Sequence, residues 1–242
     1  MTGEKIKLIR FITSSTGMGR RQAMELLKNG RVKLDGMPVR DSTIEVDPGR
    51  DKVTIDNTKV SAPRPHLYFV MYKPRKTICS REDPEGRPMV FDLLRRGHGR
   101  AFSIGRLDYN TTGVLILTTD GMLADGLLRS KKLMRQYVVK LKGAVTDGNF
   151  EKWRMGLMLE GRMTSRATVR ILERKGNVAR VLVTVTEGWY HLIHRIAERT
   201  GMRALKIHRS RFGGITLSAL KPGTYRILTK KEVDHLRAIA RV

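Results

Sequence analysis

One carboxylate has the local setting of a catalytic group. Asp108 lies in the segment GRLDYNTTGVLILTTDG, residues 105–121, between a glycine-led turn and the apolar run at 114–117. This pattern predicts a loop fixed to a buried strand, and rigid elements are where precise catalytic groups are usually mounted. Aspartates beside Gly, Asn and Thr are also common turn and cap residues. The local pattern alone therefore leaves a catalytic and a structural role open.

Other patterns with known chemistry are missing from the sequence. His191 and His194 are three residues apart, but no third ligand with a fixed spacing accompanies them, so we interpret them as helix-surface histidines and predict no metal. No GxxxxGK[ST] or GxGxxG segment supports a nucleotide cofactor. No nucleophile elbow supports a Ser/His/Asp triad. We expect neither a metal nor a cofactor.

The elements that must position Asp108 form a mainly antiparallel pattern. In order, the sequence predicts strands at 67–72 and 136–143, a hairpin over 165–188 with its turn at 175–177, a helix over 190–199, strands near Ile215 and Tyr225, and an amphipathic helix bearing Val233, Leu236 and Ile239. Strands joined by hairpins with few helices between them favour an α+β fold over a doubly wound one.

The N-terminal part predicts a small separate unit. Helices are expected over 5–16 and 20–28, followed by a hairpin in RVKLDGMPV with Asp35-Gly36 at its turn. If helix and hairpin pack side by side, their basic residues form one positive face that could follow a phosphate backbone; otherwise they are an ordinary charged helix surface. These residues are Arg20, Arg21, Lys28, Arg31 and Lys33.

The charge predicts a polyanionic partner. Lys and Arg number 48 against 23 Asp and Glu, a formal net charge of +25. Cations that neutralise phosphates release counterions, which favours nucleic acid over an anionic membrane. Residues 1–62 hold 12 basic and 8 acidic side chains, which leaves +21 for the remainder. The proline-containing segment 61–66 predicts a linker, giving domains 1–62 and 63–242.

The expected setting is the cytoplasm. The start MTGEKIKLIRF lacks the apolar core of a secretory signal, and no apolar run approaches the roughly 18 residues that span a bilayer. The single cysteine, Cys79, cannot form an internal disulfide, which agrees with a reducing compartment. We expect a monomer without membrane contact.

Two segments resemble known families. GMGRRQAMELLKNGRVKLDGMPV resembles an S4-type RNA-binding domain, with Gly19 where that domain usually has serine. GRLDYNTTGVLILTTDG closely resembles the signature of the Rsu-type RNA pseudouridine synthases, for which an S4-type domain is the expected companion. The resemblance extends through nearly the whole chain, in HLYFVMYKPRKTICSREDPEGRPMVFDLL, EGWYHLIHRIAERTG, HRSRFGGITL and KPGTYRIL.

The resemblance implies an enzyme that detaches uracil from C1′ of a uridine in RNA, turns it and reattaches it through C5. The RNA we expect is ribosomal RNA. Neither cofactor nor metal is needed. Asp108 matches the family's catalytic aspartate, which acts as nucleophile on the sugar or as base at C2′. Tyr137, in Arg135-Gln-Tyr137, matches the active-site tyrosine that packs against the target base. Arg106 matches a position that fills the space left by the flipped base.

The chain departs from the family in the closing helix. His194 stands where the family commonly has the Arg or Lys that pairs with the aspartate. Either His194 is protonated beside Asp108, or Arg195 supplies the cation, or activity is reduced. Tyr72 for the usual Asn and Lys76 for the usual Gly are smaller differences. The alternative function is a noncatalytic RNA-binding ribosome-assembly factor, and a third is a base-removing glycosylase on DNA.

Overall fold

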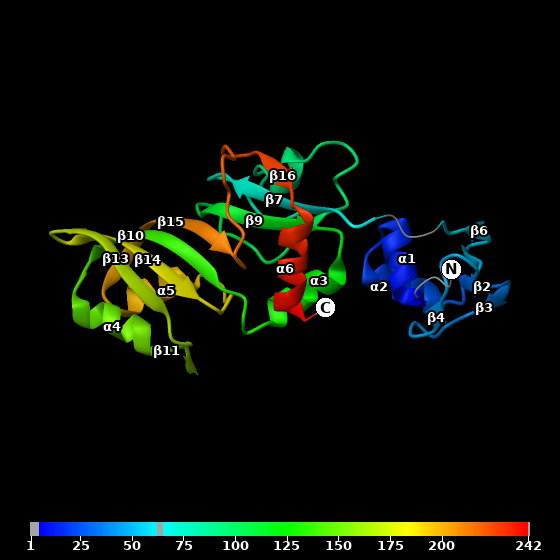
Figure 1. The fold of residues 1–242 in the computed structure, drawn as a ribbon, viewed down its shortest axis with the longest axis horizontal. Coiled ribbons are helices and arrows are strands. Elements are labelled where there is room, and N and C mark those ends of the chain that lie inside the picture. The colour runs from blue at the N-terminus through cyan, green and yellow to red at the C-terminus, as the bar shows by residue number, and fades with distance from the viewer. Residues whose placement is uncertain (1–4, 62–64, 242) are drawn as a thin grey trace. The chain divides into compact units, whose positions relative to one another are not determined.

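The computed structural model describes residues 5–61 and 65–241. The chain divides into two compact units, Met1–His66 and Leu67–Val242 (Figure 1). The predicted linker at 61–66 lies at this division, and its residues 62–64 are outside the described part. None of the described helices has the length and hydrophobicity needed to cross a bilayer.

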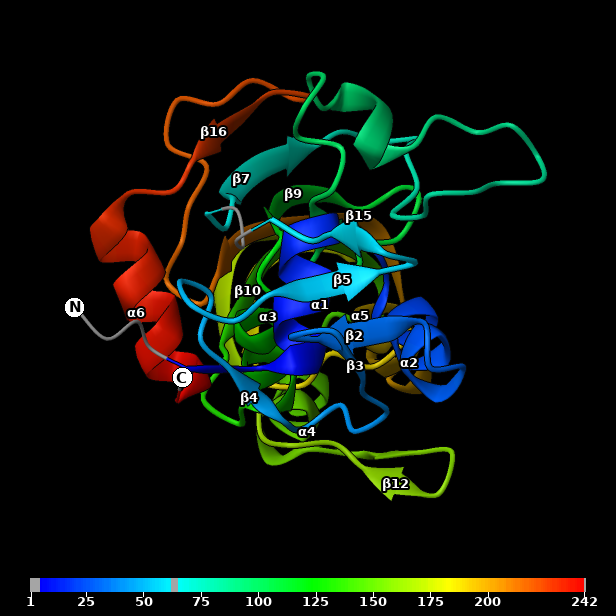
Figure 2. The same ribbon diagram turned by 90° about the vertical axis from the view of Figure 1, so that its right-hand side faces the viewer.

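The N-terminal unit packs two helices against short strands. Its elements are β1 (Ile6–Lys7), α1 (Leu8–Thr16), α2 (Arg20–Lys28), β2 (Val32–Leu34), β3 (Met37–Pro38), β4 (Glu45–Val46), β5 (Val53–Ile55) and β6 (Thr58–Lys59). The antiparallel sheet has the order β3-β2-β5-β6, and β1 pairs with β4. Leu8 and Ile12 of α1 share one core with Val32 and Val53 of this sheet. Figure 2 shows β2 and β5 of the sheet across α1.

The sequence prediction for this unit needs one correction. The second helix and the Asp35-Gly36 hairpin are confirmed, and both turn residues have positive φ, as a tight two-residue turn requires. The first helix begins at Leu8 instead of Lys5. Ile6 and Lys7 are extended because they pair with β4, and this tertiary pairing overrides a helical spacing that was only local.

The second unit is built on an eight-stranded sheet. Its strands follow the order β13-β14-β10-β15-β9-β7-β16, with β8 also paired to β9. The strands are β7 (Tyr68–Lys73), β8 (Phe102–Ser103), β9 (Thr112–Thr118), β10 (Arg135–Gly143), β13 (Thr168–Lys175), β14 (Val178–Val185), β15 (Met202–Phe212) and β16 (Tyr225–Ile227). Every pairing in this sheet is antiparallel except β15 with β9, which confirms the mainly antiparallel α+β prediction.

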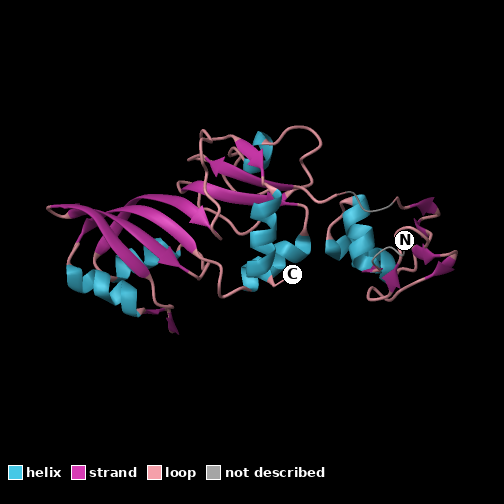
Figure 3. Cartoon of the chain, viewed as in Figure 1, coloured by secondary structure: helices cyan, strands magenta, loops and turns pink. Residues whose placement is uncertain are grey.

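Helices cover the sheet unevenly (Figure 3). The remaining elements are η1 (Val90–Leu93), α3 (Gly121–Arg129), α4 (Asp147–Met155), the pair β11 (Met158–Leu159) and β12 (Arg162–Met163), α5 (Leu192–Arg199) and α6 (Lys230–Ala240). Helices α4 and α5 share a core with one face of β10, β13, β14 and β15. Helices α3 and α6 pack with β7 and β9 in a second core, and η1 contributes to a third core on the other side of those two strands.

The two halves of this sheet meet at Gly113. The parallel pairing of β9 with β15 consists of His208 opposite Thr112 and Arg209 opposite Gly113. Gly113 has φ +119°, and a Cβ placed there would lie 2.2 Å from the Arg209 carbonyl oxygen. Only glycine allows the two strands this close, because a side chain would collide with the neighbouring backbone.

The sequence analysis missed the longest strand of the sheet. Strand β15 has charged residues at odd-numbered and at even-numbered positions, so apolar and polar side chains do not alternate along it. Near Ile215, where a strand was predicted, there is an isolated bridge to Phe212 instead. Helices α3 and α4 were also not predicted, and the predicted helix over 190–199 begins at Leu192. The strands β7, β10, β13 and β14 agree with the prediction to within about one to three residues.

Candidate active site

The loop that carries Asp108 is held from both sides. Its neighbour Leu107 is buried, and the Cys79 Sγ lies 3.5 Å from both the Leu107 backbone nitrogen and its carbonyl oxygen. The Thr111 N–H donates to the Asp108 carbonyl at 3.0 Å and closes a tight turn. The Asp108 side chain is 32% exposed. The backbone is therefore fixed while the carboxylate stays accessible.

Lys73 supports this loop from inside the protein. Its Nζ donates to the carbonyl oxygens of Thr111 at 2.9 Å, Pro74 at 3.0 Å and Tyr109 at 3.4 Å. The side chain is fully buried. Burial lowers the pKa of Lys73 to about 8, although the negative charges of Cys79 in its thiolate form and of Asp108 oppose this shift. A buried cation thus lies close enough to the Asp108 carboxylate to feel its charge.

A row of residues across four strands forms the floor of the site. Lys73 on β7 lies opposite Gly113 on β9, Gly113 opposite Arg209 on β15, and Arg209 opposite Tyr137 on β10. Arg209 is buried and its Nε donates to the Val114 carbonyl at 2.8 Å. Tyr137 is partly buried and packs against both the α4/α5 core and the η1 core. The row therefore brings two cations and one aromatic ring to the seam between these cores.

Two histidines face the two oxygens of the Asp108 carboxylate. The His191 Nε2 lies 3.2 Å from Oδ1, and the His194 Nδ1 lies 3.8 Å from Oδ2. Burial, joined by the neighbouring His191, lowers the pKa of His194, and the charge of Asp108 only partly opposes this. His194 is therefore mainly neutral at neutral pH. A neutral imidazole still carries one N–H with which it can donate to a carboxylate.

His191 is positioned by an unusual backbone conformation. It is the N-cap of α5 with φ 52° and ψ 26°, in the left-handed region, and its ring stacks on Tyr190 with 3.9 Å between centroids. Non-glycine residues in this region cost roughly 1 kcal/mol or more and persist where the surroundings hold them. The pattern-based interpretation as helix-surface histidines was wrong for His191, whose imidazole lies at Asp108. For His194 the structure agrees with the alternative that places it beside Asp108.

Arg195 and Arg106 occupy other positions around the site. The Arg195 Nη2 lies 2.6 Å from Glu160 Oε2. In this structure Arg195 therefore pairs with Glu160, whereas one of the alternatives from the sequence paired it with Asp108. Arg106 is exposed and lies two residues before Asp108 in the same loop. Of the residues proposed from the sequence, the structure thus brings His194 to Asp108, keeps Arg106 in its loop and directs Arg195 elsewhere.

The five basic residues that the sequence analysis named in the N-terminal unit form two groups. Arg20, Arg21 and Lys28 line an open hollow of about 560 Å³ on α2, together with Met24 and Glu25. By contrast, Arg31 and Lys33 reach the turn between β5 and β6. Arg31 makes paired hydrogen bonds to Asp56, and the Lys33 Nζ donates to the Asn57 Oδ1 at 3.0 Å.

The site offers general base or nucleophilic chemistry through one carboxylate. Asp108 combines an accessible carboxylate with two imidazoles, and the buried Lys73 lies beneath its loop. Within residues 5–61 and 65–241, no three His, Cys, Asp or Glu side chains gather in a way that could hold a metal ion. Sequence reasoning missed Lys73, whose only signal was its place beside Pro74 at the end of a buried strand.

Comparisons with known proteins agree on one family. The family model described as RNA pseudouridylate synthase matches residues 67–198. The ribosomal large subunit pseudouridine synthase B of Bacillus subtilis is 34% identical over 97% of this chain and 96% of the relative. The protein of the same name from Escherichia coli K12 is 33% identical over 96% and 82%. A crystal structure of a pseudouridylate synthase superposes with a TM-score of 0.68 at 27% identity, over 96% of this chain and 99% of that one.

Proposed function

The chain belongs to the RNA pseudouridylate synthase family, and we propose that it converts one uridine of large-subunit ribosomal RNA to pseudouridine through the carboxylate of Asp108. The ribosomal substrate is proposed from the names of the relatives in Bacillus subtilis and Escherichia coli. The net charge of +25 suits a polyanionic substrate.

The observation that carries this proposal is the surroundings of Asp108. Its carboxylate is accessible, its loop is tied to the buried Lys73, and His191 faces one of its oxygens at 3.2 Å. An N–H of His191 would orient Oδ1, while Oδ2, 3.8 Å from the His194 Nδ1, stays open to the substrate. A group that is already fixed in the correct orientation lowers the entropic cost of bringing the reacting atoms together.

The reaction exchanges the glycosidic bond to N1 for one to C5 and moves one proton. The C1′–N1 bond of uridine breaks, the C1′–C5 bond forms, the proton on C5 leaves and N1 gains a proton, so that product and substrate have the same composition. Asp108 acts either by attack on C1′ or by removal of the C2′ proton. Both routes need the ionised carboxylate, and the buried Lys73 under the loop lies close enough to interact with its charge.

Tyr137 and Arg106 are proposed to handle the base. The Tyr137 ring lies on the same face as Lys73 and Arg209, in the seam between two cores, where it can pack against a uracil turned out of its helix. The exposed Arg106 is proposed to occupy the space that the base leaves. We also propose that the N-terminal unit is an S4-type RNA-binding domain, which Arg20, Arg21 and Lys28 on one hollow support.

Site-directed exchange of the carboxylate tests this function. Purified protein should convert a uridine in unmodified ribosomal RNA, detected as a primer-extension stop after carbodiimide treatment. Asp108→Asn should abolish conversion while RNA affinity stays near that of the unaltered protein. The matched control is Asp125→Asn, because Asp125 is an exposed aspartate of α3 that pairs only at the surface with Arg129. Conversion that survives in Asp108→Asn would overturn the proposed mechanism.

A noncatalytic ribosome-assembly factor is the second candidate. It is favoured by one observation: burial lowers the pKa of His194, so the side chain at the position of the family's cation is mainly neutral at neutral pH. Such a protein would bind ribosomal RNA with salt-sensitive affinity and show no conversion at any pH. A DNA glycosylase, the third possibility, would release free uracil, which chromatography of the reaction mixture detects.

A further inference from the structure

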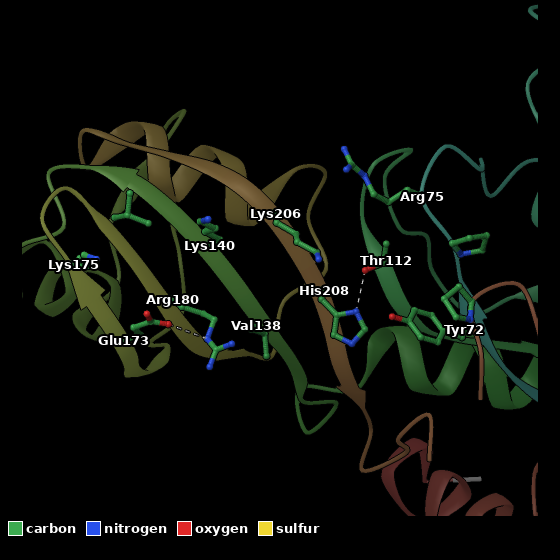
Figure 4. A pocket seen from close by; sticks show the side chains of 13 residues that line it. Tyr72, Arg75, Thr112, Val138, Lys140, Glu173, Lys175, Arg180, Lys206 and His208 are labelled. Carbon is green, nitrogen blue, oxygen red and sulfur yellow. Dashed lines mark hydrogen bonds and ion pairs between the residues drawn. The ribbon is translucent and has the colours of Figure 1, made fainter. Parts of the chain in front are cut away.

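One face of the β13-β14-β10-β15 half-sheet has a large hollow on the side opposite Asp108. Successive side chains of a strand point to opposite faces. Tyr137 contacts the α4/α5 core, so its neighbour Val138 points to the other face, where it lines a cavity of about 1020 Å³. Tyr72 and Thr112 line the same cavity from β7 and β9, next to Lys73 and Gly113 of the Asp108 face (Figure 4).

A row of cations crosses this hollow. Lys140 on β10 lies directly opposite Lys206 on β15 and directly opposite Arg180 on β14. All three side chains are exposed, and the cavity has two further cations, Arg75 and Lys175. Like charges directly opposite one another in a sheet are destabilising. The chain therefore keeps an arrangement that costs stability unless an anion lies over it.

The single acid of the hollow does not neutralise this row. Glu173 lies beyond Arg180, with 3.9 Å between its Oε2 and the Arg180 Nε, and both side chains are more than half exposed. An exposed ion pair of this kind contributes little. Lys140 and Lys206 are not offset by it, and the hollow has a net positive charge.

The floor of the hollow is aromatic and apolar. His208 lies 5.5 Å from Tyr72 in an edge-on arrangement, and its Nδ1 is 2.9 Å from the Thr112 hydroxyl. Val138 lies opposite His208 in the sheet. Aromatic surfaces between cations are what a single nucleic acid strand uses, because its bases can stack while its phosphates meet the basic side chains. A duplex hides its base faces and would leave this floor unused.

We propose that this face, lined by Tyr72, Val138, Lys140, Arg180, Lys206 and His208, binds an unpaired RNA segment distinct from the nucleotide that reaches Asp108. The two places lie on opposite faces of the same sheet, so one nucleotide cannot occupy both. The inference takes RNA as the partner from the proposed function, but it does not depend on catalysis by Asp108.

A triple neutralisation tests the proposal. Lys140→Gln, Arg180→Gln and Lys206→Gln are combined in the full chain, and the matched control combines Lys131→Gln, Lys230→Gln and Lys231→Gln, three exposed lysines elsewhere in the same unit. The probe is a twelve-nucleotide adenine oligoribonucleotide, which contains no uridine for the Asp108 site. At 0.1 M salt the hollow triple should bind it at least about tenfold more weakly than the control triple. Its slope of log affinity against log salt should be smaller by about 2, the value for three lost phosphate contacts in a single strand.

Two results would overturn the proposal. One is equal affinity of the two triple variants for the oligonucleotide. The other is an equal loss of affinity for a twelve-base-pair RNA duplex, which would contradict the assignment to an unpaired strand. Thermal unfolding checks that the variant with the three hollow substitutions is folded. Since these substitutions remove like charges that face one another, its unfolding midpoint should stay the same or rise. Failure of Asp108→Asn to abolish conversion would leave these binding results standing, so the two proposals fail separately.

Discussion

The two faces of the large sheet use positive charge in different ways. On the Asp108 face the cations Lys73, Arg135 and Arg209 are 0%, 5% and 2% exposed, and each donates to backbone carbonyl oxygens. On the opposite face Lys140, Lys206 and Arg180 are exposed and lie side by side. Buried cations have fixed positions and act over short distances, whereas exposed cations act on charges in the solvent and are screened by salt.

This difference separates positioning from attraction. A buried lysine costs free energy through desolvation and is retained where its geometry is needed, as Lys73 is under the Asp108 loop. An exposed row of cations positions nothing within the protein, but it raises the local concentration of a polyanion. Substitutions on the Asp108 face should therefore change the catalytic rate, and substitutions on the opposite face should change RNA affinity and its dependence on salt.

Apart from the loss of the Asp108 carboxylate itself, the largest effect is expected from Lys73→Met. Three carbonyl oxygens around the Asp108 loop lose their donor, and a small displacement of a catalytic group can reduce the rate about 100-fold. We therefore expect kcat for pseudouridine formation to fall by about that factor. The unfolding free energy at pH 7 should change little, because relieved desolvation offsets the lost hydrogen bonds. The control is Lys152→Met on α4, an exposed lysine, which should leave kcat unchanged.

The pH dependence of unfolding sharpens this test. Below pH 8 Lys73 is protonated in both states, so the folded protein bears the full cost of the buried charge. Between about pH 8 and 10.5 the folded protein has released a proton that the unfolded chain still binds. The unfolding free energy should therefore rise with pH in this window, relative to Lys73→Met, by up to about 3 kcal/mol. Chemical denaturation at pH 7.5 and pH 10.5 measures it, and parallel curves would contradict a charged, buried Lys73.

Local patterns predicted the fold where each strand has one buried face. In β14, the buried Val181, Val183 and Val185 alternate with less buried residues, so the hairpin with β13 was evident. Strand β15 was missed because it lies in the centre of the sheet and its charges point to both faces, Arg209 to the buried row and Lys206 to the hollow. When both faces of a strand carry charged side chains, apolar and polar residues no longer alternate along it, and this alternation is the signal by which a strand is predicted from sequence.

The candidate site was predicted only in part, because its residues come together through tertiary contacts. The segment around Asp108 is contiguous and could be recognised, and so could the strand with Tyr137. His191 and Lys73 reach Asp108 only when α5 and β7 are packed on the sheet. The i, i+3 spacing of His191 and His194 was a usable signal, but it was considered as a metal site and not as a pair facing a carboxylate.

An intermediate effect is expected from His191→Ala. The His191 Nε2 is 3.2 Å from the carboxylate, within reach of a hydrogen bond that aligns when substrate binds. Such a bond to a charged group contributes about 1.5–3 kcal/mol, or a factor of about ten or more in rate. His194→Ala should cost less than about threefold at pH 7, since its nitrogen is 3.8 Å away and burial lowers the pKa of His194. Single-turnover rates on ribosomal RNA separate the two variants. Equal losses would show that both imidazoles act together.

The His194 position also gives a directional test. Because its pKa is lowered, His194 gains a proton only in acid, and any contribution of its charge to activity should fade as the pH rises toward neutrality. His194→Arg places a permanent cation beside Asp108 and should extend activity to higher pH if that charge assists the reaction. An unchanged pH profile would show that a charge at this position does not assist Asp108, which leaves the buried Lys73 as the cation coupled to it.

The smallest effect is expected from Lys140→Gln on the opposite face. Lys140 faces a cation on each neighbouring strand, so its neutralisation should raise the unfolding free energy by about 0.5 kcal/mol at low salt, within the range of cross-strand pair energies. The gain should vanish in 1 M salt, where the screening length is about 3 Å. Lys152→Gln is the control, because Lys152 lies on α4 outside the row of cations. A loss of stability in Lys140→Gln would mean that the lysine stem packs on the sheet, and that the row is kept for structure and not for a polyanion.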